Sequence, residues 1–150
     1  RGEVRTERTN VPFTQKSRVL SKEEREREAT ISEAKRLLII GGAITVEDER
    51  DQLIAFATKN DMEWGVTRAL VQGYLAPHER QIGVSGLTVA PDLVILVGAS
   101  GSIQTMSGIR RAKKIVAINS DEDAPVFDNV DIALVGSWQD VVDKTCPGGF

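Results

Sequence analysis

The sequence has a single cysteine, Cys146, and a single histidine, His78, among its 150 residues. One cysteine cannot form an internal disulfide, and one Cys with one His cannot supply the four ligands of a structural zinc site. Long apolar runs are also missing, because the longest, such as Leu93–Val97, fall far short of the roughly 20 residues that span a bilayer. We therefore expect neither a disulfide scaffold, nor a metal site, nor a membrane-spanning chain.

Aromatic residues and an excess of positive charge are also scarce. The chain has 2 Trp, 1 Tyr and 4 Phe, and 19 Lys+Arg against 22 Asp+Glu give a net charge of -3. No basic stripe interleaved with aromatics is present, so we expect no nucleic-acid partner. No nucleophile and base pair stands out either, since we place His78 in an exposed loop and regard Cys146 as a bystander. Because residues 1–4 do not resemble a signal peptide, we expect a cytoplasmic protein.

The distribution of charged residues divides the chain into two parts. Residues 1–36 are rich in charge of both signs, whereas residues 81–109 carry one charge, Asp92. A length of 150 residues suits one domain with a real core. We predict a charged lead-in segment over residues 1–36 and a folded domain over residues 37–150.

The lead-in offers little apolar surface. Residues 3–8 and 15–20 could form edge strands at most. Ser21 and Glu24 have the spacing of a capping box, which predicts a short helix after Ser21. This charged helix either faces water or forms a docking surface, and the first reading is favoured.

The folded part begins with short apolar runs that are closed by Gly or Asn. Continuous apolar runs indicate strands buried on both faces, as in a parallel sheet between two layers of helices. A weaker strand is expected at Trp64–Val66. The strong runs are Leu37–Ile40, Leu93–Val97, Ile115–Ile118 and Ile132–Val135.

Helices are expected between these strands. Thr45 can cap a helix with an apolar face, and residues 102–109 and 138–144 suit two shorter helices. The alternation predicts a doubly wound, Rossmann-like α/β fold with a mostly parallel sheet and helices on both faces. Ligands of such folds bind at the carboxyl ends of the strands, so the residues that follow each strand are candidates for a site. The expected apolar face consists of Leu53, Ile54 and Ala57.

Two candidate segments follow the third and fourth of these strands. Residues 98–104 turn through glycines and serines into a helix, which suits either a phosphate cradle or merely a tight turn. No Walker or GxGxxG pattern is present, so these residues do not specify which type of nucleotide would bind. Asn119 can bond a ribose or a base edge, or it can cap the turn that follows, and the turn is favoured.

Two further candidates lie earlier in the chain. Arg68 follows the weak strand, and it either pairs with a carboxylate or points a cation at an electron-rich ligand. Ser85 lies between glycines in residues 82–86, which suits close approach to a flat ligand or a plain hairpin. When each residue is considered alone, the salt bridge is favoured for Arg68 and the plain hairpin for Ser85.

Taken together, these segments resemble the C-terminal FAD-binding domain of the electron transfer flavoprotein alpha subunit. The order and spacing hold from about Leu37 to Val142. In this family the alpha subunit has a further N-terminal domain, so the resemblance implies that the chain is part of a larger subunit. The segments that carry the resemblance are residues 67–68, 81–86, 89–93, 98–104 and 115–127.

The resemblance implies roles for individual residues. Arg68 would lie against the flavin ring and favour its negatively charged reduced forms, beside Thr67. Ser85 would hydrogen-bond near flavin N5. Asn119 would lie at the adenosine end. The remaining implied contacts with FAD are Ile82, Gly83 and Val84 in the loop with Ser85; Ser100, Gly101, Ser102, Ile103 and Gln104 at the ribityl and phosphate part; Thr105 near the flavin pyrimidine carbonyl; and Ser137 with Trp138.

The chain departs from the family pattern at several of these positions. Ala43 replaces an arginine after the first strand, Thr105 replaces a histidine, and Val84 replaces a glutamine. Ser137 and Trp138 stand where the family commonly has Asp-Leu. Losing a cation and an imidazole should weaken phosphate pairing and make an anionic flavin less favourable.

The resemblance implies an electron carrier rather than an enzyme. It would use FAD to accept electrons from flavin dehydrogenases and pass them to a downstream acceptor, as the alpha subunit of a heterodimer with a beta subunit. One alternative is an assembly or binding module that kept the fold and lost tight flavin binding, which Ala43 and Thr105 favour. Another is a domain that uses NAD(P) or serves a thiamine enzyme, against which the missing GxGxxG and the presence of Arg68 with Ser85 weigh.

Overall fold

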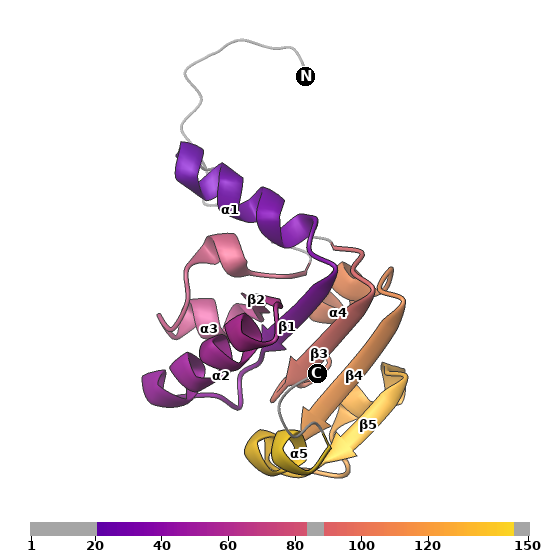
Figure 1. Ribbon diagram of the computed structural model, residues 1–150. Helices are drawn as coiled ribbons and strands as arrows, with labels where there is room; N and C mark the ends of the chain where they lie inside the picture. The colour runs from indigo at the N-terminus through magenta and orange to yellow at the C-terminus, as the bar shows by residue number, and fades with distance from the viewer. Residues whose placement is uncertain (1–20, 84–88, 146–150) are drawn as a thin grey trace.

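A computed structural model describes residues 21–83 and 89–145 of the chain (Figure 1). The edge strands expected within residues 3–8 and 15–20 lie outside these ranges. The elements are α1 (Lys22–Ser32), β1 (Arg36–Ile40), α2 (Glu47–Lys59), β2 (Glu63–Val66), α3 (Arg68–Gln72), the 3-10 helix η1 (His78–Arg80), β3 (Leu93–Val97), α4 (Ile103–Ile109), β4 (Lys114–Asn119), the 3-10 helix η2 (Pro125–Asn129), β5 (Ile132–Val135) and α5 (Trp138–Thr145).

The five strands in the described part of the chain form one parallel sheet in the order β2-β1-β3-β4-β5. The register places Ile40 of β1 opposite both Val66 of β2 and Val97 of β3. The chain first adds β2 on one side of β1 and then crosses to the other side for β3. The strand order therefore reverses between β1 and β3, and ligands of such sheets bind outside the carboxyl ends at that point.

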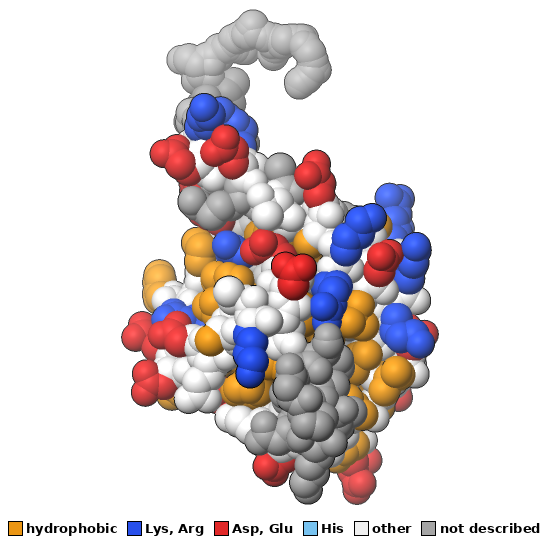
Figure 2. Space-filling view, viewed as in Figure 1, with side chains coloured by type: hydrophobic (Ala, Val, Ile, Leu, Met, Phe, Trp, Pro, Cys, Tyr) orange, Lys and Arg blue, Asp and Glu red, His pale blue; other side chains and the backbone are white. Residues whose placement is uncertain are grey.

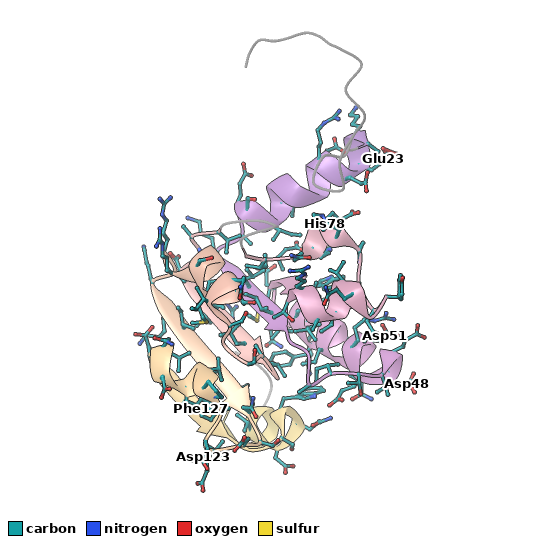
Figure 3. All side chains as sticks on the ribbon, turned by 180° about the vertical axis from the view of Figure 1, so that it is seen from behind. Glu23, Asp48, Asp51, His78, Asp123 and Phe127 are labelled. Carbon is teal, nitrogen blue, oxygen red and sulfur yellow. The ribbon has the colours of Figure 1, made fainter. Side chains whose placement is uncertain are left out.

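The sheet buries side chains of β1, β3 and β4 on both of its faces, which confirms the doubly wound α/β prediction, whereas most of β5 at the sheet edge is exposed. Leu37 and Ile39 of β1 point to the face that is covered by α4 and η2, where Phe127 lies (Figure 3). Leu38 and Ile40 point to the opposite face, which α2, α3 and α5 cover (Figure 1). Because successive side chains of a strand alternate between faces, continuous apolar runs are needed to fill both layers.

The predicted capping box at the start of α1 is confirmed. The Ser21 N–H donates to Glu24 Oε1 at 2.9 Å, and the Glu24 N–H donates to Ser21 Oγ at 3.1 Å. Charged side chains of both signs cover much of α1 and of the surface seen in Figure 2. The end of α1 nevertheless joins the core, because Ile31 is fully buried on the face with α4.

Two local expectations were wrong. The N-cap of α2 is Val46 rather than Thr45, and no side chain caps this helix. Three acidic residues in the first turn favour the start of α2 through the helix dipole instead. His78 belongs to η1 and is half-buried rather than placed in an exposed loop, because η1 packs against α1 and β2. The expected inner face of α2 is otherwise correct, with Leu53 and Ala57 buried.

Candidate functional site

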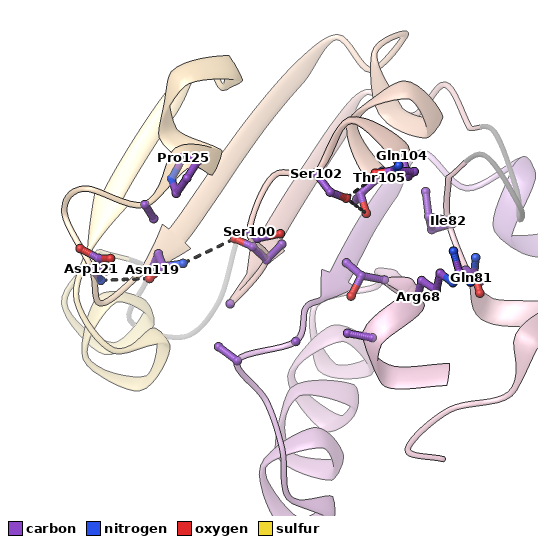
Figure 4. A pocket seen from close by; sticks show the side chains of 17 residues that line it. Arg68, Gln81, Ile82, Ser100, Ser102, Gln104, Thr105, Asn119, Asp121 and Pro125 are labelled. Atoms are coloured by element: carbon purple, nitrogen blue, oxygen red, sulfur yellow. Dashed lines mark hydrogen bonds between the residues drawn. The ribbon is translucent and has the colours of Figure 1, made fainter. Parts of the chain in front are cut away.

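A cleft of about 540 Å³ opens at the carboxyl edge of the sheet, around the point where the strand order reverses (Figure 4). The segments that follow β1, β2, β3 and β4 all contribute to its walls. This convergence of loops is what the parallel sheet imposes, because the carboxyl ends of parallel strands meet at one edge. The lining residues are Gly42, Ala43, Thr67, Arg68, Ala69, Gln81, Ile82, Gly98, Ala99, Ser100, Ser102, Gln104, Thr105, Asn119, Asp121, Ala124 and Pro125.

The loops after β1 and β3 are held together backbone to backbone. The Gly41 N–H donates to the Val97 carbonyl oxygen at 2.8 Å, and the Ala43 N–H donates to the Gly98 carbonyl oxygen at 3.0 Å. A Cβ on Gly41 would lie 2.3 Å from the Cα of Ala99, which is closer than any real Cβ atom approaches another non-bonded heavy atom. Glycine at this position therefore lets the two loops form one continuous wall of the cleft.

Arg68 lies at the mouth of the cleft as the first residue of α3. The loop before it is tied down, because the N–H of the buried Thr67 donates to the Ile40 carbonyl oxygen at 3.0 Å. Arg68 itself is exposed and pairs with no carboxylate among the described residues. Within the described lining, Arg68 is the one cation and Asp121 the one anion.

The segment between β3 and α4 brings several hydroxyl groups to the cleft. Its backbone turns through Gly98 at φ 69° and Gly101 at φ 81°, a region that glycine adopts without strain. Ser100 is exposed on the cleft wall. Ser102 caps α4, since its Oγ accepts the Thr105 N–H at 3.3 Å and lies 3.2 Å from Thr105 Oγ1. Thr105 is therefore a buried, bonded part of the cap.

The chain after η1 packs against the start of α4. The Ile82 N–H donates to the Val66 carbonyl oxygen at 2.9 Å, which places Ile82 in the cleft wall beside Gln81. Gly83 has φ 129°, and a Cβ there would lie 2.5 Å from the Gln104 carbonyl oxygen. Val84 and Ser85 lie outside the described residues, so the expected hydroxyl near flavin N5 stays a prediction.

Asn119 links two loops at the far end of the cleft. Its Oδ1 accepts the Asp121 N–H at 2.9 Å, and its Nδ2 approaches the Ala99 carbonyl oxygen at 3.5 Å (Figure 4). The expectation that Asn119 caps the turn after β4 is thus confirmed. The same side chain lines the cleft, so the turn also presents an amide to a ligand.

A second cavity of about 160 Å³ adjoins the cleft. It shares Ala43, Gly98 and Asn119 with the cleft and continues to Ser137 and Trp138 at the start of α5. The Trp138 Nε1–H donates to Glu49 Oε2 of α2 at 2.9 Å. The predicted pair at residues 137–138 therefore lies beside the cleft rather than inside it.

Three of the predicted residues that the structure describes, Gly83, Gly101 and Ile103, line neither cavity. Gly101 packs against η2, since a Cβ on it would lie 2.5 Å from the Cα of Val126. Ile103 is 83% exposed at the start of α4. Gly101 and Ile103 belong to the predicted loop after β3 but serve its turn and its outer surface, while Gly83 packs against the backbone of Gln104.

Sequence reasoning missed several lining residues. Gln81 could have been found because it precedes the predicted residue Ile82. Asp121 could have been found because it lies two residues after Asn119, at the end of β4. Glu49 carried no signal, since 89 residues separate it from its partner Trp138. A contact of that kind is visible only in the folded chain.

The lining groups together suit an elongated ligand with an electron-rich end. The volume of the cleft lies within the roughly 300–1,000 Å³ of small-molecule sites. One end presents the guanidinium of Arg68, and glycine-lined turns let a ligand approach the backbone closely. The other end presents the Asn119 amide and leads to an indole.

Comparison with known proteins gives consistent matches. A family model described as "Electron transfer flavoprotein FAD-binding domain" matches residues 30–110. The chain is 37% identical over 128 residues to the mitochondrial electron transfer flavoprotein subunit alpha of Arabidopsis thaliana, covering 85% of this chain and 35% of that protein. Identity is 38% over 112 residues with the subunit alpha of Paracoccus denitrificans (75% and 36% covered) and 40% over 110 residues with that of Pseudomonas aeruginosa (73% and 36%). The chain thus spans little more than a third of the length of these relatives.

Proposed function

Because the chain belongs to the family of electron transfer flavoprotein alpha-subunit FAD-binding domains, we propose that it holds FAD in the carboxyl-edge cleft and carries electrons. The donors are flavin dehydrogenases, and the acceptor is a downstream redox partner. One observation above all supports this proposal. Eight of the residues expected to contact FAD come from four separate segments of the chain and line one cleft at the point where the strand order reverses: Thr67, Arg68, Ile82, Ser100, Ser102, Gln104, Thr105 and Asn119.

The residues present fit FAD. When bound, the flavin accepts and donates the electrons, while the protein supplies binding, orientation and electrostatics. Arg68 and Thr67 hold the flavin end, with Ile82 as an apolar contact in the wall. Ser100 and Gln104 hold the middle of the cofactor, and Asn119 holds the adenosine end.

Arg68 tunes the cofactor in this proposal. Since its guanidinium has no carboxylate partner among the described residues, its charge is available to a ligand in the cleft. A cation beside the ring stabilises added negative charge, so it raises the reduction potential of the flavin. The protein is then a carrier that sets a potential, and it makes or breaks no substrate bond.

A second candidate function is a binding or assembly module that no longer holds FAD tightly. Ala43 favours it, because this residue lines both cavities with a methyl group where the family has an arginine. Thr105 favours it as well, since its hydroxyl is engaged with Ser102 and it offers no imidazole. Flavin content distinguishes the two functions.

The partners follow from the family in the same way. We propose that the chain acts in an alpha subunit that assembles with an electron transfer flavoprotein beta subunit. No helix in the described part of the chain is both long enough and apolar enough to cross a membrane. The cytoplasmic location expected from the sequence stays a proposal, because the relatives include a mitochondrial subunit.

The visible spectrum tests the proposal. The complete alpha subunit, purified with its beta subunit and reconstituted with FAD, should show flavin absorbance after the excess is removed. A colourless protein would overturn the proposal and support the assembly module.

The charge of Arg68 has its own test. Arg68→Ala should lower the one-electron potential by about 40 mV, because a unit charge about 4 Å away contributes about 1 kcal/mol in water and 59 mV corresponds to about 1.4 kcal/mol. Arg68→Lys keeps the positive charge and should change the one-electron potential less than Arg68→Ala does. Equal potentials for wild type and Arg68→Ala would remove Arg68 from this role.

A further inference from the structure

Glu49, in the first turn of α2, connects two helices at the second cavity. Its Oε2 accepts the Trp138 Nε1–H at 2.9 Å and lies 3.5 Å from Gln139 Nε2. Helices α2 and α5 cover the same face of the sheet (Figure 1), and these contacts join their first turns. The three side chains all line the second cavity.

The hydrogen bond holds the indole in one place. Trp138 is half-buried, with part of its ring packed against the core cluster that includes Val141 and the rest lining the cavity. A bond from an N–H to a carboxylate is stronger than one to a neutral acceptor. An indole that is fixed by packing and by this bond loses little freedom when a flat group stacks on it, so binding costs less ordering.

We propose that Glu49 is a positioning residue for the cofactor, because it fixes the Trp138 indole as a stacking surface for the purine base of FAD. The inference rests on the proposed function, since it concerns the same ligand. The second cavity shares Ala43, Gly98 and Asn119 with the cleft, so the two spaces are adjacent. A ligand with a ring at each end can occupy both, and an indole offers the flat apolar face that a base needs.

Affinities for FAD and FMN test this inference, because both contain the flavin and only FAD contains the purine. Dissociation constants are measured on the complete alpha subunit with its beta subunit. Trp138→Ala should weaken FAD binding by about tenfold or more, as loss of a stacked aromatic does for other bases. Glu49→Ala should weaken FAD binding by about five- to tenfold. Affinity for FMN should stay within twofold of wild type in both variants.

Two further variants separate positioning from damage to the fold. In the double variant Glu49→Ala with Trp138→Ala, FAD should bind no more weakly than in Trp138→Ala alone, because Glu49 acts through the indole. Trp138→Phe keeps an aromatic ring but removes the N–H, so its effect on FAD should be at least that of Glu49→Ala and smaller than that of Trp138→Ala. The matched control is Glu47→Ala, which removes the same charge from an exposed position in the same helical turn, and it should bind both ligands as wild type does.

Three results would overturn the inference: unchanged FAD affinity in Glu49→Ala, an equal loss of FMN affinity, or a double variant clearly weaker than Trp138→Ala. If the wild type takes up no FAD, the proposed function fails separately, and ADP then serves as the probe. Quenching of Trp138 fluorescence by ADP that is weakened in Glu49→Ala supports the positioning role. Absence of quenching, or equal quenching in both proteins, overturns it.

Discussion

Replacing Gly41 with alanine tests the close contact on which the cleft depends. The new Cβ would lie 2.3 Å from Ala99 Cα, 2.5 Å from Ala99 N and 2.6 Å from the carbonyl carbon of Gly98. All three are backbone atoms, so no side chain can rotate away. The loops after β1 and β3 must separate by more than about 1 Å to reach ordinary contact distances.

The cost follows from what this separation breaks. The Gly41 N–H to Val97 and the Ala43 N–H to Gly98 bonds, at 2.8 and 3.0 Å, span the two loops. Losing both costs about 2 kcal/mol, and overpacking adds about 1–3 kcal/mol. We therefore expect Gly41→Ala to lower the free energy of unfolding by about 3–5 kcal/mol. For a chain of this size that is a fall in Tm of about 6–20 °C.

Thermal unfolding followed by circular dichroism, together with urea titration, measures this effect. Gly73→Ala is the matched control, because Gly73 has φ -87° and the nearest atom to its Cβ would be the Ala69 carbonyl oxygen at 3.3 Å. It should change stability by no more than about 1 kcal/mol. If Gly41→Ala and Gly73→Ala melt within about 2 °C of each other, the argument from loop contact is refuted.

Other substitutions test single contacts. Ser102→Ala should cost about 1 kcal/mol in urea titration, because it removes the side-chain cap of α4; an unchanged midpoint would contradict this. Arg80→Lys should lower the free energy of unfolding by about 1–2 kcal/mol, because lysine has no planar guanidinium to stack on the Trp64 ring, which lies 4.2 Å from Arg80 Cζ. Wild-type stability in this variant would show that the stacking contributes nothing. Ser21→Ala should speed amide exchange in α1 while leaving the global unfolding transition within about 1 kcal/mol; unchanged exchange would show that the capping box is not protective.

The strands were the most predictable part of the fold. The run at residues 93–97 is β3 with the same bounds, and Trp64–Val66 lies within β2. Burial on both faces leaves continuous apolar runs, which are visible in one dimension. The start of α2 was less predictable, because Thr45 suggested a side-chain cap and the helix begins one residue later without one. Cap positions depend on local backbone geometry as well as on residue type.

The candidate site was predictable only where it lies next to a strand in sequence. Arg68 and Asn119 were found because each lies within two residues of the end of a strand, and both line the cleft. Their environments were not predictable. Arg68 was expected to form a salt bridge if read alone, but it pairs with no described carboxylate.

The sequence by itself determined the strands, the helices α1, α2, α4 and α5, and the polar residues that follow the strands, but not α3 or the two 3-10 helices. Apolar periodicity and turn chemistry act over a few neighbouring residues, so they can be read along the chain. Tertiary structure alone decided that Gly41 lies against Ala99 and that Glu49 bonds Trp138. These contacts join loops and helices far apart in sequence, and they depend on strand order, register and close packing, which no local pattern specifies.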